Sequence, residues 1–385
     1  MPCLETANPL LQEESVASAA IRVDVVSSYQ EFLNLQPEWD LLSEAAQLDH
    51  PFLEFEWIRT WFDCCGKGSA LNILVVYEGR EVIAIAPLIL TRIKMWSIEV
   101  KRLGFFYNDH VPRADFMVAR GRGDVYPVIW KHLIENRNWD LVQLCQLPEG
   151  SGTLTQLARL ATEDGCPSDV WASGAAPYIT VSESWRRYHD GLPVKHRSNL
   201  RNRFKRLNQV GQVEIEAITA DCNVDEAMQP ALALEGAAWK GSSGTAIACD
   251  PSLTRFYKEF AGRAAKKGWL RLHFLKAGSR RIAFDYSLEY KNRLYLLKLG
   301  YDPDFAAYSP SNLLLCLALQ GSFERGVAVY DLLGQTADWK RNWTQEAREH
   351  YWLYIFRGSF KGRLLFALKF RLVPFLKRTI ARGTR

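Results

Sequence analysis

The sequence lacks several patterns that would place a chain in a familiar class of protein. Its eight cysteines form no Cys-x-x-Cys pair and no Cys/His cluster at zinc-ligand spacing, so we expect reduced, mostly structural thiols and no metal. No segment matches a Walker loop or a Gly-x-Gly-x-x-Gly fingerprint, which argues against NTP and dinucleotide binding. Residues 1–20 have neither a basic region nor a long apolar core, so we expect a disordered start, no secretory signal and a cytoplasmic protein.

Acidic side chains are scarce in two stretches. From residue 350 onward there are nine Lys/Arg and no Asp/Glu, and residues 186–206 hold eight basic side chains against one acid. Because the net charge of the 385 residues is +5, the rest of the chain is near −11. This distribution excludes a uniformly basic nucleic-acid binder and indicates two positive patches on an acidic body. We expect residues 186–206 to form one long helix, whose basic groups also suit a solvated face.

The C-terminal stretch mixes Leu and Phe with Lys and Arg. Charges interrupt it too often for a membrane span, but the pattern fits a helix on an anionic surface. Residues 359–385 are therefore a candidate for peripheral membrane contact at the inner face of the membrane. Packing of this stretch on the protein's own body is the alternative.

Three short landmarks recur in the same order in the two halves of the chain. The pairs are offset by 199, 196 and 191 residues: Ile83-Ala84 with Ile282-Ala283, Leu103-Gly104 with Leu299-Gly300, and Asp140-Leu141 with Asp331-Leu332. Each occurs in a matching element type, which favours a duplicated α/β unit with mixed sheets. We place a first, degenerate unit at 21–182, a second unit with the active site at 183–350, and a basic amphipathic segment at 351–385. We expect the two units to join near residues 165–185, a stretch rich in Gly, Pro and Ser.

Residues 282–301 predict a β-hairpin whose turn is centred on Lys291-Asn292. A symmetric turn pairs residues whose numbers add up to 583, which sets Asp285 opposite Lys298. Because side chains alternate along a strand, Asp285 lies on a polar face, which is either ordinary surface or the floor of a cleft. Opposite charges across a strand pair are also a common stabilising device.

Residues 230–246, PALALEGAAWKGSSGTA, combine a helix with a loop. Pro230 suits a first helical turn, and spacings of three and four put Leu232, Glu235 and Trp239 on one face. Partial burial of a carboxylate raises its pKa toward the neutral value that a general base needs. The alternative is a Glu at the edge of the apolar stripe, paired with Lys or Arg.

The segment SPSNLLLCL, residues 309–317, predicts the start of a helix with no polar face. Pro310 suits the first helical position and Ser309 is a favourable N-cap. The helix starts just past a strand that ends near Tyr301, which is where ligands bind in open α/β sheets and where free N–H groups suit a pyrophosphate. The capping pattern alone is a weak signal, because most such helix starts bind nothing.

Six segments together resemble the CelD-like branch of the GNAT acyltransferase superfamily, whose bacterial members are linked to cellulose and other exopolysaccharide synthesis. They are PFLEFEWIRTWF (51–62), VIAIAPLIL (82–90), LEGAAWKGSSGTA (234–246), RRIAFDYSL (280–288), YLLKLGYDPDFAAYSPSNLLL (295–315) and YDLLGQTADWKRNW (330–343). The resemblance implies two tandem GNAT-like units, a fold shared with Fem-type aminoacyl transferases, and acetyl-CoA or another acyl-CoA as co-substrate.

The resemblance also points to site residues, to which we assign roles on chemical grounds. We expect CoA to be held by Ser309, Pro310, Ser311, Asn312 and Leu313. We expect the acceptor to be bound by Trp239, Lys240, Gly241, Thr245 and Asp302. Glu235 is the first choice as general base and Asp285 the second, Tyr301 protonates the leaving thiolate, and Lys298 positions it or binds an acidic acceptor. The family has Gly after Ser-Pro, so the side chain of Ser311 holds the backbone further from a pyrophosphate.

The expected function is transfer of an acyl group, first of all acetyl, from acyl-CoA to an amine or hydroxyl. The acceptor is a saccharide or another small molecule in exopolysaccharide or cell-envelope synthesis. A Fem-type enzyme with an aminoacyl-tRNA donor, bound by residues 186–206, is one alternative. A non-catalytic scaffold in an envelope-polymer complex is the other, and intact cellular function after substitution of Glu235, Asp285 or Tyr301 would favour it.

Overall fold

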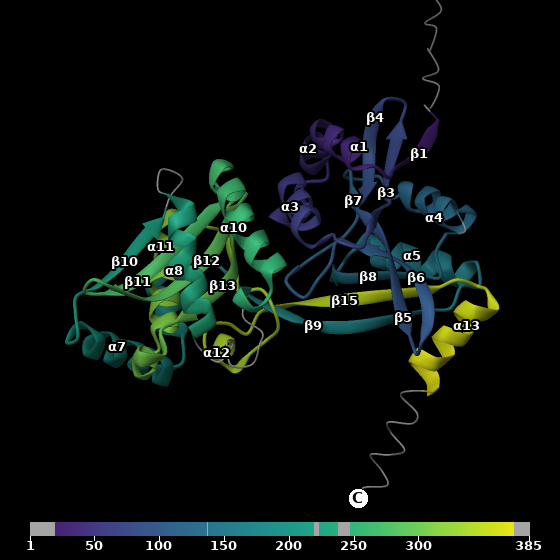
Figure 1. Cartoon of the computed structure of the whole chain (residues 1–385). Helices are drawn as coiled ribbons and strands as arrows, with labels where there is room; N and C mark the ends of the chain where they lie inside the picture. The colour runs from purple at the N-terminus through teal and green to yellow at the C-terminus, as the bar shows by residue number, and fades with distance from the viewer. Residues whose placement is uncertain (1–19, 137, 219–222, 238–246, 373–385) are drawn as a thin grey trace, which may run out of the picture.

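Two halves joined by a pair of long strands make up the fold (Figure 1). The computed structural model describes residues 20–136, 138–218, 223–237 and 247–372, so nearly all of the predicted disordered start lies outside the described residues. Helices and strands alternate in both halves, which confirms the predicted α/β class with mixed sheets.

The elements of the first half are β1 (Ile21–Val26), α1 (Tyr29–Asn34), α2 (Gln36–Ala45), η1 (Pro51–Leu53), α3 (Phe55–Cys65), β2 (Ala70–Leu71), β3 (Ile73–Glu78), β4 (Glu81–Ala86), β5 (Leu88–Met95), β6 (Ile98–Phe105), β7 (Met117–Val118), α4 (Val125–Glu135), β8 (Leu141–Pro148), α5 (Gly152–Glu163) and β9 (Ser168–Thr180).

The second half contains α6 (Trp185–Gly191), α7 (Val194–Asn208), β10 (Val213–Ile218), α8 (Val224–Ala237), η2 (Ile247–Cys249), α10 (Pro251–Lys266), β11 (Leu270–Ala277), β12 (Arg280–Tyr290), β13 (Arg293–Tyr301), η3 (Pro303–Tyr308), α11 (Pro310–Arg325), β14 (Val329–Asp331), α12 (Asp338–Arg341), β15 (Ala347–Phe356), α13 (Phe360–Phe366) and η4 (Ala367–Leu372).

The predicted duplication is confirmed by strand pairing. Each half has an antiparallel meander followed by a helix and a strand that pairs in parallel with the last meander strand: β6 with β8, and β13 with β14. The Leu-Gly landmarks Leu103-Gly104 and Leu299-Gly300 lie on β6 and β13, which are equivalent strands. Two related α/β units therefore follow each other along the chain.

The last strands of the two halves are exchanged. In the 11-stranded sheet the order is β10-β11-β12-β13-β14-β9-β15-β8-β6-β5-β2, so β9 pairs with β14 of the second half and β15 with β8 of the first. Figure 1 shows β9 and β15 side by side between the two halves. Most of the stretch 165–185, where we expected the two units to join, is β9, and the predicted boundary at residue 350 falls inside β15.

Pro87 separates β4 from β5 in the first half, whereas the corresponding β12 is continuous. Proline has no backbone N–H to donate to a neighbouring strand. β4 consequently pairs with β3 in a four-stranded sheet, β1-β3-β4-β7, while β5 pairs with β6 in the large sheet.

Helices cover both faces of the second-half sheet. α8 and α10 pack on one face, and α11 packs against β11, β12 and β13 on the other. Leu313, Leu314, Leu315 and Leu319 of α11 are buried, as the apolar segment predicted. Two helix predictions were wrong: residues 186–206 form two helices separated by Leu192-Pro193, and Pro230 lies inside α8 rather than in its first turn.

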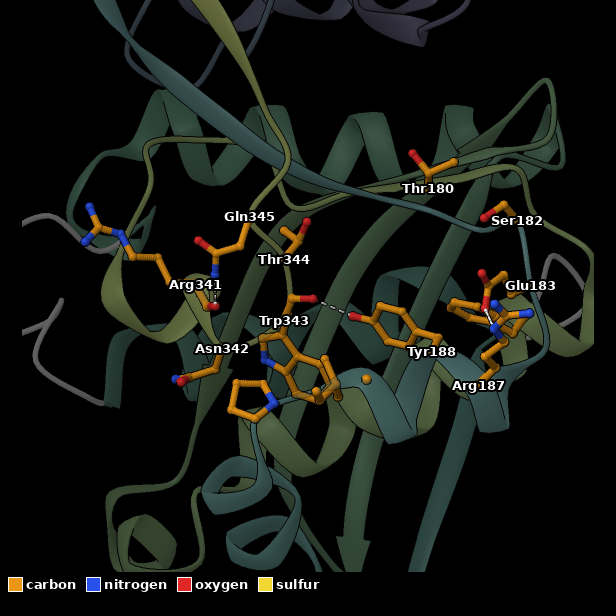
Figure 2. Close-up of a pocket in the computed structure, with 14 residues that line it drawn as sticks. Thr180, Ser182, Glu183, Arg187, Tyr188, Arg341, Asn342, Trp343, Thr344 and Gln345 are labelled. Atoms are coloured by element: carbon orange, nitrogen blue, oxygen red, sulfur yellow. Dashed lines mark hydrogen bonds and ion pairs between the residues drawn. The ribbon is translucent and has the colours of Figure 1, made fainter.

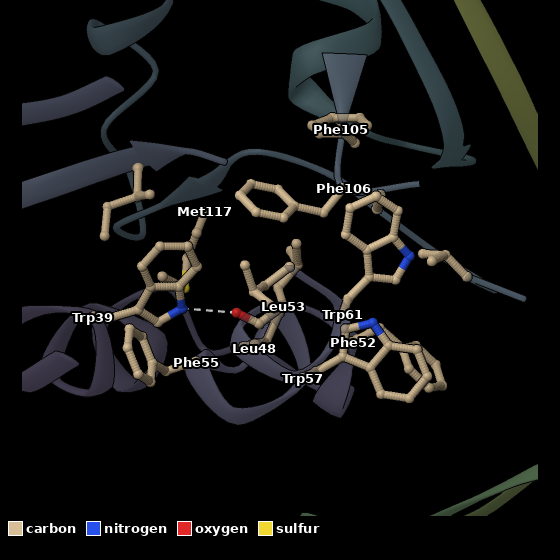
Figure 3. Close-up of a cluster of buried hydrophobic side chains, with 14 of the residues drawn as sticks. Trp39, Leu48, Phe52, Leu53, Phe55, Trp57, Trp61, Phe105, Phe106 and Met117 are labelled. Carbon is tan, nitrogen blue, oxygen red and sulfur yellow. Dashed lines mark hydrogen bonds between the residues drawn. The ribbon is translucent and has the colours of Figure 1, made fainter. Parts of the chain in front are cut away.

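An aromatic core lies beneath α2 and α3 (Figure 3). The indole N–H of Trp39 donates to the carbonyl of Leu53 at 2.8 Å, which satisfies a fully buried donor. Trp57 meets Phe256 and Phe260 of α10 edge-to-face, with ring centres 5.1 and 4.8 Å apart. Because Trp57 belongs to the first half and α10 to the second, one apolar core continues across the junction.

The chain after β15 returns along the first half as α13 and η4. Leu365 is buried, whereas Phe360 and Leu364 are 85% and 40% exposed. Among the described residues no helix is long and apolar enough to cross a bilayer.

Candidate functional site

A cleft of about 650 Å³ opens where β13 and β14 diverge. The two strands are paired only from Arg293 to Tyr295, and β13 continues to Tyr301 without a partner in β14. After β14 the chain turns away at Leu333, whose φ is +48°. The cleft is lined by Glu235, Leu296, Leu297, Lys298, Leu299, Gly300, Tyr301, Ser311, Asn312, Leu332, Leu333, Gly334, Gln335, Ala337, Trp339 and Lys340.

The equivalent strands of the first half stay together at the corresponding point. Gly104 of β6 is paired with Gln143 of β8, and a Cβ at Gly104 would lie 2.7 Å from the carbonyl oxygen of Gln143. At Gly300 the crowding comes instead from α8, since a Cβ there would lie 2.8 Å from the carbonyl oxygen of Leu234. The divergence of the parallel strands is therefore wider in the second half.

Gly300 also brings Glu235 to the cleft. The absence of a side chain at this position lets α8 approach β13 closely, and a Cβ would lie 2.9 Å from the Cα of Glu235. The Glu235 side chain is only 1% exposed, and its Oε2 accepts a hydrogen bond from the N–H of Ile247 at 2.8 Å. The prediction of a carboxylate on a buried helix face is confirmed.

Five of the sequence-predicted site residues line this one cleft: Glu235, Lys298, Tyr301, Ser311 and Asn312. They come from α8, β13 and α11, which are separated by up to 77 positions in the chain. The Lys298 ammonium lies 5.4 Å from the ring centre of Tyr257 on α10. The lining of this cleft thus combines a carboxylate, an amine and a phenol beside a helix start.

The start of α11 differs in detail from the prediction. Ser309 occupies the N-cap position in a left-handed conformation, and its side chain makes no capping hydrogen bond. Its carbonyl accepts from the N–H of Asn312 at 3.0 Å and of Leu313 at 3.3 Å. Since Pro310 has no N–H, the amide of Ser311 is the one donor of this turn without an acceptor among the described residues. The Ser311 hydroxyl donates to the carbonyl of Gly300 at 3.4 Å, which ties the helix start to β13.

Asp285 lies elsewhere, and its predicted pairing with Lys298 is wrong. The predicted pairing, in which the two residue numbers add up to 583, holds from Tyr290/Arg293 to Ser287/Leu296. A β-bulge then places Asp285 opposite Leu299. Its polar face is neither surface nor cleft floor, because α11 covers it.

The buried Asp285 forms a small polar cluster. Its carboxylate oxygens are both 3.2 Å from Nδ1 of His273, and the Ser287 hydroxyl donates to it at 3.0 Å. Burial lowers the pKa of His273, but the charge and hydrogen bond of Asp285 outweigh it, so the pKa is raised. Glu235 is consequently the one of the two predicted bases that lines the cleft.

The remaining predicted residues divide into two groups. Asp302 accepts from the N–H of Asp304 at 3.1 Å and pairs with Arg280 at 2.5 Å, so it shapes the loop between β13 and α11. Trp239, Lys240, Gly241 and Thr245 lie outside the described residues.

Lys340 is a cleft residue to which the sequence assigned no role. It is 7% exposed and donates to the carbonyls of Leu333 and Gln335, the latter at 3.0 Å. Burial lowers its pKa to about 8, while the charge of Asp331 opposes this shift. The only available signal was its place in the motif YDLLGQTADWKRNW, since burial of a lysine is not visible in sequence.

A buried ion pair supports the turn that bounds the cleft. Arg113 of the first half bonds Asp331 at 3.0 Å, and the two side chains are 3% and 1% exposed. The other oxygen of Asp331 accepts from the N–H of Leu333 at 2.9 Å, which holds the left-handed turn after β14. Arg348 approaches the same carboxylate at 3.4 Å. The first half therefore stabilises the cleft of the second.

A separate cleft of about 490 Å³ lies between α6 and the loop 341–345 (Figure 2). The Tyr188 hydroxyl donates to the carbonyl of Trp343 at 2.7 Å. The Trp343 indole in turn donates to Oδ1 of Asn312 at 3.3 Å, which braces the start of α11. None of the described sequence-predicted site residues lines this cleft.

We also searched the described residues for side chains that could bind a metal ion. Within the described ranges no group of three or more His, Cys, Asp or Glu side chains is arranged to hold a metal ion.

Residues 194–341 match the family model described as an acetyltransferase (GNAT) domain. Three solved structures share the fold of nearly the whole chain. FemX aligns with a TM-score of 0.60 at 11% identity, over 87% of this chain and 98% of its own. The C-terminal DUF2156 domain of a protein described as a lysylphosphatidylglycerol synthetase from Agrobacterium fabrum aligns with a TM-score of 0.53 at 11% sequence identity. The alignment covers 88% of this chain and 95% of that domain. L-PGS from Bacillus licheniformis aligns with a TM-score of 0.51 at 11% sequence identity, over 86% of this chain and 94% of its own. No curated protein matches the chain in sequence.

Proposed function

We propose that the protein is an acyltransferase that moves an acyl group, acetyl in the first instance, from acyl-CoA to a hydroxyl or amine. The observation that carries the proposal is the cleft between the diverging strands β13 and β14, whose lining includes Glu235, Lys298 and Tyr301. This cleft lies mainly in the part of the chain that matches a GNAT acetyltransferase domain. The wider divergence of strands in the second half is the reason for placing the reaction there.

The chemistry needs one proton acceptor and one proton donor besides positioning. The acceptor oxygen or nitrogen attacks the carbonyl carbon of the thioester, so that a C–O or C–N bond forms while the C–S bond breaks. Glu235 takes the proton of the acceptor, and the phenol of Tyr301 gives a proton to the CoA thiolate. Charges and protons balance without another reactant.

Positive charge beside the carboxylate suits an anionic donor. Lys298 and Lys340 both line the cleft, and the amide of Ser311, which has no acceptor among the described residues, lies at the start of a 16-residue helix. A helix start of this kind attracts phosphate oxygens. We assign the CoA phosphates to the end of the cleft at Ser311 and the thioester to the stretch of β13 that has no partner in β14.

The first test is stabilisation by the donor. A ligand at roughly 100 times its Kd raises the free energy of unfolding by about 2.7 kcal/mol. We expect acetyl-CoA or a longer acyl-CoA to raise the melting temperature, and no shift with any acyl-CoA would overturn the proposal.

The second test separates chemistry from binding. Glu235→Gln should lower acyl transfer by about 10²–10⁴-fold while the CoA-induced thermal shift is kept. Glu226→Gln is the matched control, because Glu226 is on the same helix but exposed to solvent. Equal rates for Glu235→Gln and Glu226→Gln would exclude Glu235 as the base.

An aminoacyl-tRNA donor is the second candidate, and one observation favours it. Helix α7 contains no acid, and five of its basic residues make no ion pair with a described residue: Lys195, Arg201, Arg203, Lys205 and Arg206. Such a face suits RNA phosphates, and the fold is shared with FemX. Binding of tRNA that falls steeply with salt, together with no response to acyl-CoA, would select this donor.

The CelD-like resemblance extends the proposal to exopolysaccharide or cell-envelope synthesis. Peripheral membrane contact is part of the same proposal. Phe360 and Leu364 are exposed on α13, and the exposed Arg371 follows in η4, so an anionic lipid surface is a suitable partner. Flotation with anionic liposomes, with and without residues 359–385, tests this contact, and equal recovery of the two forms would exclude it.

A further inference from the structure

A second cleft, of about 580 Å³, adjoins the proposed donor cleft and shares Gly334 and Gln335 with it. Its volume falls within the range of about 300–1,000 Å³ that is usual for ligand pockets. The other lining residues come from the loop after β6 and from β8, β9 and β15: Tyr107, Asp109, Val111, Pro112, Gln146, Trp171, Ala172, Ser173, Gly174, Ala175, Ala176, His350 and Trp352. A molecule held here would lie next to the reacting end of an acyl donor.

Small residues of β9 form one wall of this second cleft. The register between β9 and β15 shifts next to His350, so that Ser173 bulges out of the pairing and Gly174 adopts a φ of +138°. Gln335 packs into the space left by Gly174 and donates to the carbonyl of Ser173 at 3.4 Å. The loop that bounds the donor cleft is thereby attached to β9, and Gln335 faces both clefts.

Three aromatic side chains line the second cleft. Trp352 meets Tyr107 and Trp171 edge-to-face, with ring centres 5.8 and 6.2 Å apart and interplanar angles of 76° and 70°. Trp171 is 54% exposed, which is far more than a core tryptophan would be. Perpendicular rings present both faces and edges to a ligand, and an exposed indole face packs well against the C–H groups of a sugar ring.

The polar groups of the second cleft are mostly neutral. Gln146, Ser173 and Gln335 supply amide and hydroxyl groups that both donate and accept hydrogen bonds. Burial and the nearby Arg113 lower the pKa of His350 to about 4, so this side chain is neutral at pH 7. Asp109 is the one acid, and no Lys or Arg lines the cleft among the described residues. The lining itself therefore supplies no cation to a phosphate or carboxylate, although the Lys369 ammonium lies beside it, 5.4 Å from the ring centre of Trp171.

We propose that this second cleft binds the acyl acceptor and that the acceptor is a neutral saccharide. The inference rests on the proposed acyltransferase function. Indole and phenol faces pack against pyranose rings, while the amides and the hydroxyl bond the sugar hydroxyl groups. A sugar hydroxyl at the Gln335 end then meets the thioester beside Glu235.

The test uses the full-length protein and a panel of neutral tetrasaccharides built of glucose or N-acetylglucosamine, with binding measured by isothermal titration calorimetry. We expect at least one tetrasaccharide to bind, and Trp171→Ala to weaken it tenfold or more while Trp171→Phe retains most of the affinity. Trp96→Ala is the matched control, because Trp96 is 47% exposed at the turn between β5 and β6, outside the lining of either cleft. The acetyl-CoA thermal shift should be the same in all of these variants.

The outcomes separate the two proposals. A thermal shift with acetyl-CoA but no binding of any tetrasaccharide overturns the saccharide assignment and leaves the acyltransferase intact. Equal saccharide affinity in Trp171→Ala and Trp96→Ala overturns the location. Binding of a tetrapeptide amine that depends on Trp171, without saccharide binding, assigns the cleft to a peptide acceptor instead. Saccharide binding without any thermal shift by acyl-CoA supports the second cleft as a saccharide site and overturns the proposal that acyl-CoA is the donor.

Discussion

Gly300→Ala tests how the packing of α8 on β13 positions the base. A Cβ at this position would lie 2.7 Å from Cε1 of Phe284, 2.8 Å from the carbonyl oxygen of Leu234 and 2.9 Å from the Cα of Glu235. The φ of Gly300 is outside the left-handed region, so alanine is compatible with the backbone and the effect is steric. Two of the three contacts are backbone atoms of α8, which a side-chain rotation cannot relieve.

The size of the effect follows from these distances. To restore an ordinary contact of 3.4 Å, the Leu234 carbonyl must move by about 0.6 Å. Overpacking of this kind costs about 1–3 kcal/mol of unfolding free energy. The same movement displaces Glu235 within the cleft, and since a misplacement of about 1 Å costs roughly 100-fold in rate, we expect a loss of about tenfold.

Urea denaturation and initial rates of acyl transfer measure the two effects. Gly262→Ala is the matched control, because Gly262 lies inside α10 and a Cβ there meets nothing within 4 Å. It should stabilise the protein by about 0.5–1 kcal/mol, as Gly to Ala does in a helix interior. A Gly300→Ala variant as stable as Gly262→Ala would refute the steric argument, and a destabilised variant with an unchanged rate would refute the link to Glu235.

Two further perturbations test buried charges. Arg113→Met should lower the unfolding free energy by about 3 kcal/mol, because it removes the ion pair at 3.0 Å from the buried Asp331 and leaves Arg348 at 3.4 Å. Arg92→Met, at an exposed ion pair, should cost less than about 1 kcal/mol. Similar losses for the two variants in urea denaturation would contradict this reasoning. The raised pKa of His273 means that the folded state holds its proton more tightly, so the stabilisation is complete below about pH 6.5 and is lost as pH rises through the folded-state pKa. His273→Gln should therefore lose less stability than the wild type as the pH rises above about 6.5, and parallel curves of stability against pH would exclude the His273–Asp285 pair as the cause.

The hairpin of β12 and β13 shows which features of a strand pair can be predicted from neighbouring residues and which cannot. The turn residues Lys291 and Asn292 both have positive φ, as a two-residue hairpin requires, and the predicted register holds for the first four pairs. One bulged residue then shifts every later pair, which moved Asp285 away from Lys298. Turn chemistry depends on adjacent residues, whereas a bulge four pairs away has no signature of its own in the sequence.

The strand β9 within residues 165–185 was not predicted, for a related reason. Its Gly, Pro and Ser residues are typical of a loop, but both edges of β9 are paired with strands that occur about 150 or more residues later. Strand formation there depends on those partners rather than on propensity. The predicted end of the first unit at residue 182 falls just after β9, whereas the predicted end of the second unit at residue 350 falls inside β15.

The sequence by itself determined the features that a few neighbouring residues encode. These are the alternation of helices and strands, the turn at Lys291-Asn292, the apolar helix that starts at Pro310 and the Leu-Gly step on both β6 and β13. It also placed Glu235 on a buried helix face, because helical spacing is a local property.

Only the tertiary structure decided which of these features meet. The exchange of β9 and β15, the ion pair of Arg113 with Asp331, and the cleft that unites Glu235, Tyr301 and Lys340 all join residues far apart in the chain. A hydrophobic pattern specifies which face of an element is buried but not what covers it. The candidate acceptor cleft follows from that second kind of information, since its tryptophans lie on two strands that become neighbours only through the exchange.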